Sequence, residues 1–233
     1  MRGVLISGTD TDVGKTYVTA LIARELVSAG VNLGVYKPAC SGADVTDGRE
    51  RWTDLETLSQ ASGITDLDRI CPQRFAAPLA PPVAARQAGG SVDWDVIQTG
   101  LTCWESDADF VLVEGVGGLL CPLTDSHSMA DFAIWTGLPV IIVARLGLGT
   151  INHTLLTLEA ADRRGLSVEG VILNDADNQA VSPAAGTNVA ELARLSSVPV
   201  LGIVSCHGQT LQLRDGIPRE RMAWLREIDN VCV

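Results

Sequence analysis

The chain has 233 residues and a formal net charge of −11, because 28 acidic side chains face only 17 lysines and arginines. Hydrophobic residues make up 46% of it, which excludes disorder and is enough for a substantial core. The acidic balance repels phosphate backbones and membrane surfaces, so we expect no nucleic acid and no membrane among the partners. The stretch before Gly8 is too short for a secretory signal and no apolar run is long enough to span a membrane. We therefore expect a cytoplasmic protein, or one of a plastid or mitochondrion if a transit peptide was removed.

Apolar runs that could form buried strands alternate with helical patterns along the chain. Several of these runs are apolar at every position, so both faces of the sheet must be covered, as in a parallel sheet. The pattern predicts an α/β fold, doubly wound with a mainly parallel sheet of the P-loop NTPase kind, in a single domain over residues 1–233. The expected strands are Val4–Ser7, Leu33–Lys37, Phe110–Val113, Val140–Val143, Val168–Leu173 and Val198–Val204, and the expected helices are 15–29, 53–62, 93–105, 128–136, 150–164 and 184–195.

The most informative segment is 8–16, which reads Gly-Thr-Asp-Thr-Asp-Val-Gly-Lys-Thr between an expected strand and an expected helix. Backbone N–H groups of such a loop point at phosphates, and the helix adds the positive end of its dipole. Gly14 lets the backbone approach closely, Lys15 reaches the β- and γ-phosphates, and the Thr16 hydroxyl can bind Mg²⁺. The segment predicts a nucleoside triphosphate site, although five residues instead of the usual four separate the two glycines.

Further polar residues fall where strands of the expected sheet end. Lys37 ends the second strand, Glu114 follows the third, and Asn174 and Asp175 follow the fifth. In parallel sheets ligands collect at the carboxyl ends of the strands, so these residues are expected to share one site with the loop. Lys37 could also simply end a strand in water, and Glu114 could be a solvated strand end.

The segment 72–90 contains Pro72, Pro78, Pro81 and Pro82. Because proline lacks an N–H and clashes with the preceding turn, we expect no regular helix there. A loop that wraps over the site or over a neighbouring element is the alternative. Six cysteines without a C-x-x-C pair indicate neither a zinc site nor a disulfide framework, and Cys103 and Cys121 are expected to be small buried apolar residues.

Four segments, in order, resemble dethiobiotin synthetase, the ATP-dependent enzyme of biotin synthesis. They are the loop at 8–16, then Lys37–Gly42, Val113–Gly118 and Gly149–His153. The resemblance implies that CO₂ condenses with 7,8-diaminopelargonate to a carbamate, which ATP converts to a carbamic-phosphoric anhydride. Attack by the second amine closes the ring of dethiobiotin and gives ADP and phosphate as the other products.

The resemblance also implies roles for individual residues. Lys37 and Lys15 are catalytic, Thr11 and Ser41 contact the substrate, and Mg²⁺ is held by Thr16, Asp54 and Glu114. An acidic residue at the start of a helix, such as Asp54, can alternatively serve only the helix dipole. The resemblance implies a homodimer in which the substrate carboxylate meets Gly149, Thr150 and Ile151 of a second subunit. The residues implied to hold ATP are Asp12, Val13, Gly14, Lys15, Thr16, Tyr17, Asp54, Glu114, Gly115, Val116, Gly117, Asn174 and Asp175.

Two other functions compete with this interpretation. Another ATP-dependent ligase of the superfamily, such as a cobyrinate-amidating enzyme, needs a glutaminase domain for which the chain has no room. A partition-type ATPase switch would carry a second lysine near the start of the loop, where Thr9 and Asp10 stand. A guanine-reading Asn-Lys-x-Asp is absent, which favours adenine. Residues 202–207 lack the proline that the family often places beside the base, so the strictness of the ATP preference stays open.

Overall fold

The computed structural model describes residues 1–176, 178 and 183–231. Seven strands form its main sheet in the order β11-β10-β9-β8-β1-β7-β2. Neighbouring strands in this sheet run parallel, except that β11 pairs antiparallel with β10. The predicted α/β fold with a mainly parallel sheet is therefore confirmed. The strands are β1 (Gly3–Gly8), β2 (Leu33–Tyr36), β7 (Phe110–Glu114), β8 (Val140–Arg145), β9 (Val168–Asn174), β10 (Val200–Val204) and β11 (Gln212–Leu213).

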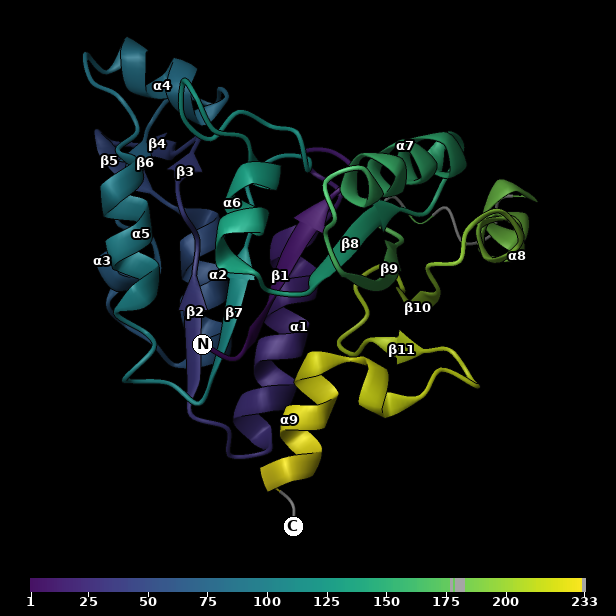
Figure 1. Cartoon of the computed structure of the whole chain (residues 1–233). Coiled ribbons are helices and arrows are strands. Elements are labelled where there is room, and N and C mark those ends of the chain that lie inside the picture. Colours follow the sequence, from purple (N-terminus) through teal and green to yellow (C-terminus); the bar gives the residue numbers. More distant parts are fainter. Residues whose placement is uncertain (177, 179–182, 232–233) are drawn as a thin grey trace.

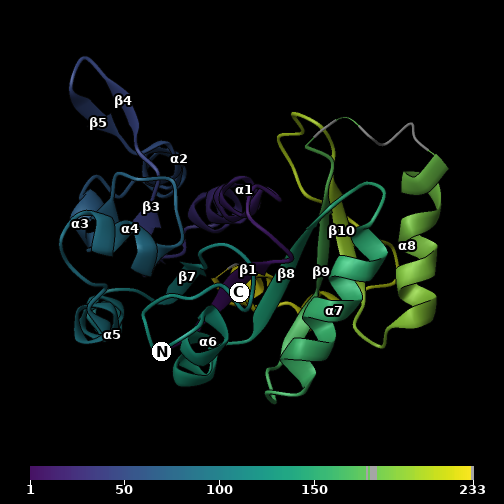
Figure 2. The ribbon, with the colours of Figure 1, turned by 90° about the horizontal axis from the view of Figure 1, so that it is seen from above.

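Helices cover both faces of the sheet (Figures 1 and 2). Alternate residues of each central strand point to opposite sides: Val4 and Ile6 of β1 pack with one core cluster and Leu5 with the other. Because both faces are packed, the strands are apolar throughout. The first face carries α1 (Lys15–Ser28), α2 (Thr53–Ser62) and α9 (Ala223–Val231), and the second carries α5 (Trp94–Thr102), α6 (Met129–Thr136), α7 (Thr150–Asp162) and α8 (Pro183–Leu195).

The six predicted strands and six predicted helices all exist, with bounds that differ by at most a few residues. The prediction of no regular helix in 72–90 is wrong, because α4 spans Pro81–Gln87. Pro81 and Pro82 occupy its first turn, where the backbone N–H groups have no intrahelical partner, so proline is tolerated there.

Several short elements were not predicted. They are the pair β3 (Cys40–Ser41) and β6 (Arg74–Phe75), the hairpin β4 (Asp44–Thr46) and β5 (Arg49–Arg51), α3 (Leu67–Ile70), and beyond β10 the strand β11, a 3₁₀ turn at Arg219–Arg221 and α9. Most are too short to carry a periodic signal. The helix α9 does carry one, because Trp224, Leu225 and Ile228 follow helical spacing and pack on the α1 face.

Two smaller expectations can also be compared with the structure. Cys103 is exposed and Cys121 half-buried, so the expectation that both are buried is wrong, while Cys232 lies outside the described residues. Within the part of the chain that the structure describes, no helix is both long and apolar enough to cross a bilayer.

Candidate active site

A cavity of about 820 Å³ lies at the carboxyl edge of the sheet, beside the phosphate loop. The loop, the ends of β2 and β7, the start of α2 and the segment before α4 all contribute to its walls. Most of the predicted site residues line it: Thr11, Asp12, Gly14, Lys15, Thr16, Tyr17, Lys37, Ser41, Asp54, Glu114, Gly115, Val116 and Gly117.

Sequence reasoning missed part of the lining, which includes Cys40, Gly42, Asp44, Thr53, Thr57, Leu79, Ala80 and Cys121. Pro78 and Pro81 also line the cavity, so the proline-rich segment does wrap over the site. Four of these lining residues stand within a few positions of a predicted site residue in the sequence, and this nearness is the signal that could have found them. They are Cys40, Gly42, Thr53 and Cys121.

The phosphate loop owes its shape to glycine and to contacts with β9. Gly14 has a φ of 92°, and a β-carbon on it would lie only 1.9 Å from the Asn174 side-chain nitrogen, so only glycine fits. The same nitrogen donates to the carbonyl oxygen of Val13 at 3.0 Å. Lys15 Nζ donates to the Asp10 carbonyl at 2.9 Å, which bends the lysine back across the loop. These contacts hold the loop in a defined shape.

Lys37 contacts two carboxylates, and one of them also contacts the phosphate loop. Its Nζ donates to Glu114 Oε1 at 2.6 Å and also pairs with Asp54. Thr16 Oγ1 donates to the same Glu114 oxygen at 2.8 Å. Lys37 and Glu114 are buried, whereas the Asp54 side chain is 46% exposed and faces the cavity. The sequence places these four residues up to 98 positions apart, and the fold brings them into direct contact.

Burial and charge act in opposite directions on the lysines of this cluster. Burial alone would lower the pKa of Lys37, but Glu114 and Asp54 outweigh it, so the pKa lies well above its ordinary range. The pKa of Lys15 is lowered, mainly because burial disfavours its charged form and despite the attraction of Glu114. Lys37 is therefore fully protonated at neutral pH.

The donors of the cluster fit a magnesium ion. Glu114 Oε2 is completely buried and has no hydrogen-bond partner among the described residues. A buried carboxylate oxygen without a partner is costly, and a cation beside it would offset this cost. Burial would raise the pKa of Asp54, but Lys37 and the Thr16 hydroxyl together hold it below its ordinary value, so Asp54 is ionised. Two carboxylates and a hydroxyl are the hard oxygen ligands that Mg²⁺ prefers beside phosphates.

The remaining predicted residues lie at the same edge but outside the cavity lining. Asn174 and Asp175 are buried at the end of β9, on the β9 side of the phosphate loop. Gly149, Thr150 and Ile151 form the start of α7, next to Leu148, a residue that is 96% exposed. The start of α7 therefore does not line the cavity of its own chain.

Comparison with known proteins decides the family. A family model described as an AAA domain matches residues 2–210. The ATP-dependent dethiobiotin synthetase of Anaeromyxobacter sp. (strain Fw109-5) is 43% identical over 224 residues, which cover 96% of this chain and 98% of that one. The chain belongs to the dethiobiotin synthetase family. A dethiobiotin synthetase of Escherichia coli O157:H7 is 37% identical over 202 residues, which cover 84% of this chain and 87% of that one.

Solved structures agree with this family in fold only. The septum site-determining protein MinD of Pyrococcus horikoshii has a TM-score of 0.53 and 18% identity, with 99% of this chain and 95% of that one covered. Chloroplast FtsY of Physcomitrella patens has a TM-score of 0.55 and 19% identity; 97% of this chain is covered, and the match spans 65% of FtsY. A likeness at such low identity shows a shared P-loop fold alone.

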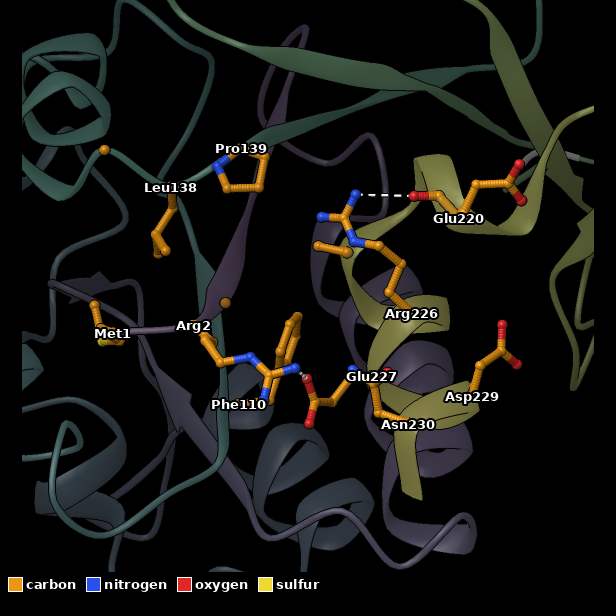
Figure 3. A pocket seen from close by; sticks show the side chains of 13 residues that line it. Met1, Arg2, Phe110, Leu138, Pro139, Glu220, Arg226, Glu227, Asp229 and Asn230 are labelled. Atoms are coloured by element: carbon orange, nitrogen blue, oxygen red, sulfur yellow. Dashed lines mark hydrogen bonds and ion pairs between the residues drawn. The ribbon is translucent and has the colours of Figure 1, made fainter. Parts of the chain in front are cut away.

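This member of the dethiobiotin synthetase family has a second cavity, of about 500 Å³, at the opposite edge of the sheet (Figure 3). Arg2 points to Glu227 of α9 and pairs with it, and Arg226 donates to the Glu220 carbonyl at 2.9 Å. Among the described residues, none of the predicted site residues lines it. Arg2 and Glu227 pair with each other, while Arg226 and Asp229 pair with Glu169 and Arg219 outside the lining, so these charges hold elements of the fold together.

Proposed function

We propose that the cavity at the carboxyl edge carries out the dethiobiotin synthetase reaction of the family. CO₂ and 7,8-diaminopelargonate are condensed and cyclised to dethiobiotin while ATP is converted to ADP and phosphate. The observation that carries the proposal is the position of Lys37, which contacts both Asp54 and Glu114 beside the phosphate loop. Such a lysine lies where negative charge gathers when a phosphoryl group leaves a triphosphate.

In this proposal the loop at residues 12–17 holds the phosphates and Lys15 reaches their terminal part. Gly115, Val116 and Gly117 lie opposite, and Gly117 has a φ of 60°, which brings its backbone into a conformation suited to turning against phosphate. Asn174 and Asp175 read the base from the end of β9. This arrangement follows the general rule that the nucleotide occupies the carboxyl edge of the sheet.

Thr16, Asp54 and Glu114 are proposed to hold Mg²⁺, which when bound supplies positive charge to the phosphate oxygens. Occupation of this position would also satisfy the buried Glu114 Oε2. The ammonium of Lys37 is then free to turn from the carboxylates toward the carbamate. Lys37 thus lies at the wall of the cavity and is already protonated before the substrates bind.

The chain's own groups mainly position the substrate and neutralise charge. One amine of the substrate adds to CO₂ and gives a carbamate, whose oxygen takes the γ-phosphoryl group of ATP. The second amine then attacks the carbamate carbon, phosphate leaves, and the ring closes. Lys37 and Lys15 stabilise the oxygens on which charge develops. Because the second amine is tethered to the activated carbon, ring closure gains from high effective molarity. Thr11 and Ser41 orient the substrate, and Pro78 and Leu79 limit the access of water.

The far end of the substrate is proposed to bind a second copy of the chain. The substrate carries a carboxylate on a long apolar tail, and a helix N-terminus offers free N–H donors to such an anion. Gly149, Thr150 and Ile151 provide this N-terminus but lie outside the cavity of their own chain. The exposed Leu148 beside them is suited to a subunit contact. We therefore propose a homodimer in which each site uses both chains.

The reaction is tested by measuring phosphate release and dethiobiotin formation with MgATP, bicarbonate and diaminopelargonate, and then with each component omitted in turn. We expect release to depend on all three. ATP hydrolysis that proceeds equally well without the diamine would contradict the synthetase proposal and favour a nucleotide switch.

The shared site is tested by mixing two inactive variants, Lys37→Ala and Gly149→Trp. In a mixed dimer both lesions can fall in one site, which leaves the other intact. We expect activity to return on mixing, toward one working site per mixed dimer. Failure to recover after verified subunit exchange, or full activity of a strictly monomeric protein, would contradict the dimer proposal.

A further inference from the structure

The turn Ser205–Gly208, which follows β10, lies directly beside the end of β9. The Asp175 N–H donates to the Val204 carbonyl at 2.8 Å, and Cys206 Sγ lies 3.8 Å from the Ala176 carbonyl oxygen. The turn is therefore next to Asn174 and Asp175, on the side of the phosphate loop away from Lys37. A base attached to phosphates in the loop has this turn as a neighbour.

The turn has a defined internal shape. The Gly208 N–H donates to the Ser205 carbonyl at 2.8 Å, and His207 between them has a φ of 55°, in the left-handed region. A β-carbon on Gly208 would lie 2.9 Å from the Ser205 oxygen, so glycine is needed there. These contacts fix the form of the turn. They do not fix its distance from the phosphate loop.

Tyr17 sets the distance between the turn and the phosphate loop. It lies in the first turn of α1, two residues after Lys15, and its hydroxyl donates to the Gly208 carbonyl at 2.8 Å across 191 positions of sequence. The ring is partly buried and packs on the core of the α1 face, so the hydroxyl is held by a rigid element. The helix that carries the phosphate loop thus also holds the turn.

These contacts connect the phosphate loop, β9, β10 and the turn after β10, and Tyr17 links that turn back to the helix that follows the loop. The phosphate loop meets β9 where Asn174 donates to Val13, the end of β9 meets β10 where Asp175 donates to Val204, and Tyr17 of the loop helix meets the turn after β10. We infer that Tyr17 is a positioning residue for the nucleobase. Its hydroxyl holds Ser205–Gly208 as a wall of the base site and so contributes to the selection of adenine. This inference rests on the proposed ATP site and adds a determinant of its specificity.

The test compares Tyr17→Phe with the wild type in calorimetric binding of ATP, GTP and tripolyphosphate, each with Mg²⁺ and without diaminopelargonate. Tripolyphosphate occupies the loop but has no base. We expect ATP affinity to fall about 2- to 12-fold, the usual effect of one net hydrogen bond, with a lower ATP-to-GTP ratio. Tripolyphosphate affinity should stay unchanged, because the loop meets phosphates with backbone N–H groups that Tyr17→Phe retains. Gly208→Ala, which displaces the carbonyl that accepts from the Tyr17 hydroxyl but keeps Tyr17 itself, should produce the same pattern.

The matched control is Tyr36→Phe. The Tyr36 hydroxyl also donates to a backbone carbonyl, that of Ile97 at 2.7 Å, but on the other face of the sheet. Removal of this hydroxyl should lower the thermal midpoint and leave the ratio of ATP to tripolyphosphate affinity unchanged. The comparison separates a general loss of stability from a loss of base recognition.

An equal loss for ATP and tripolyphosphate in Tyr17→Phe would overturn the inference, because Tyr17 would then only support the phosphate loop. Unchanged ATP affinity and unchanged base selectivity would overturn it as well. A wild type that binds ATP yet makes no dethiobiotin contradicts the proposed reaction while this comparison still decides the role of Tyr17. A wild type that binds no ATP overturns both.

Discussion

The two edges of the parallel sheet each carry a cavity with charged walls, but they use charge differently. At the carboxyl edge Glu114 and Lys37 are buried together, and one Glu114 oxygen has no partner among the described residues. At the amino edge Arg2 is 60% exposed and pairs with the buried Glu227. Charges that satisfy one another hold elements together, whereas a buried oxygen without a partner is tolerated where a ligand completes it.

The direction of the strands explains this difference. Every parallel strand delivers its following loop to the carboxyl edge, so the phosphate loop, Lys37 and Glu114 meet there although they are far apart in sequence. The amino edge receives instead the starts of the strands and the returning helix α9, whose side chains cover it. The following predictions compare the two edges, from the largest expected effect to the smallest.

Replacement of Lys37 by alanine should have the largest effect. We expect turnover to fall by about 10²–10³, because one preorganised charge is lost where phosphoryl transfer develops negative charge, while MgATP binding stays close to normal. Steady-state turnover and calorimetric ATP binding measure the two parts. Near-normal turnover at saturating substrate would show that Lys37 only neutralises Asp54 and Glu114. Lys15→Ala is the comparison variant, since it should also weaken nucleotide binding.

Glu114→Gln and Asp54→Asn should each raise the Mg²⁺ concentration needed for half-maximal activity. We expect at least the ~10- to 100-fold change that loss of even an outer partner of a metal causes. A magnesium titration of activity at fixed ATP provides the measurement. If Asp54→Asn leaves the metal dependence unchanged, Asp54 serves only the dipole of α2. Glu56→Gln, two residues further along the same helix, is the matched control, because its carboxylate pairs with Arg51 instead of Lys37.

Arg2→Ala should change stability and leave the chemistry intact. Its removal leaves the buried Glu227 without its partner, and we expect a loss of about 1–3 kcal/mol in the free energy of unfolding. The magnesium requirement and kcat/KM should stay at wild-type values. Urea unfolding together with steady-state kinetics checks both expectations. A loss of catalytic efficiency in a folded Arg2→Ala protein would contradict the separation of the two edges.

The smallest effect concerns pH. Burial raises the pKa of Glu169, near the start of β9, above its ordinary value of 4.5, although the Ala223 N–H and the arginines 226 and 221 oppose this. The folded state therefore keeps a proton that the unfolded chain has already lost, so stability falls as pH rises from 4.5 through the raised pKa.

Glu169→Gln does not titrate and should flatten the pH profile of stability in this range, which urea unfolding between pH 4.5 and 7 can follow. The control is Glu191→Gln, because the pKa of that exposed carboxyl is lowered by Arg194 and its contribution has the opposite sign. A profile of Glu169→Gln that runs parallel to the wild type would contradict the assignment.

The sequence by itself determined the fold class, the order of the main strands and helices, and the phosphate loop. Continuous apolar runs, helical periodicity and the glycine-lysine-threonine pattern are local signals, because they follow from the backbone geometry of a few adjacent residues. The α4 helix shows the limit of a local rule. Four prolines along 72–90 predict no regular helix, but two of them occupy the first turn of α4, where proline is tolerated.

Only the tertiary structure decided which polar atoms meet. The contact of Thr16 with Glu114, the unpartnered Glu114 oxygen, and the hold of Tyr17 on Gly208 join residues 98 and 191 positions apart. No local pattern specifies such pairs, because they depend on the register of strands and on how helices pack across the sheet. The start of α7, predicted to serve the site of a second subunit, lies outside the cavity of its own chain, and packing across the sheet set this position as well.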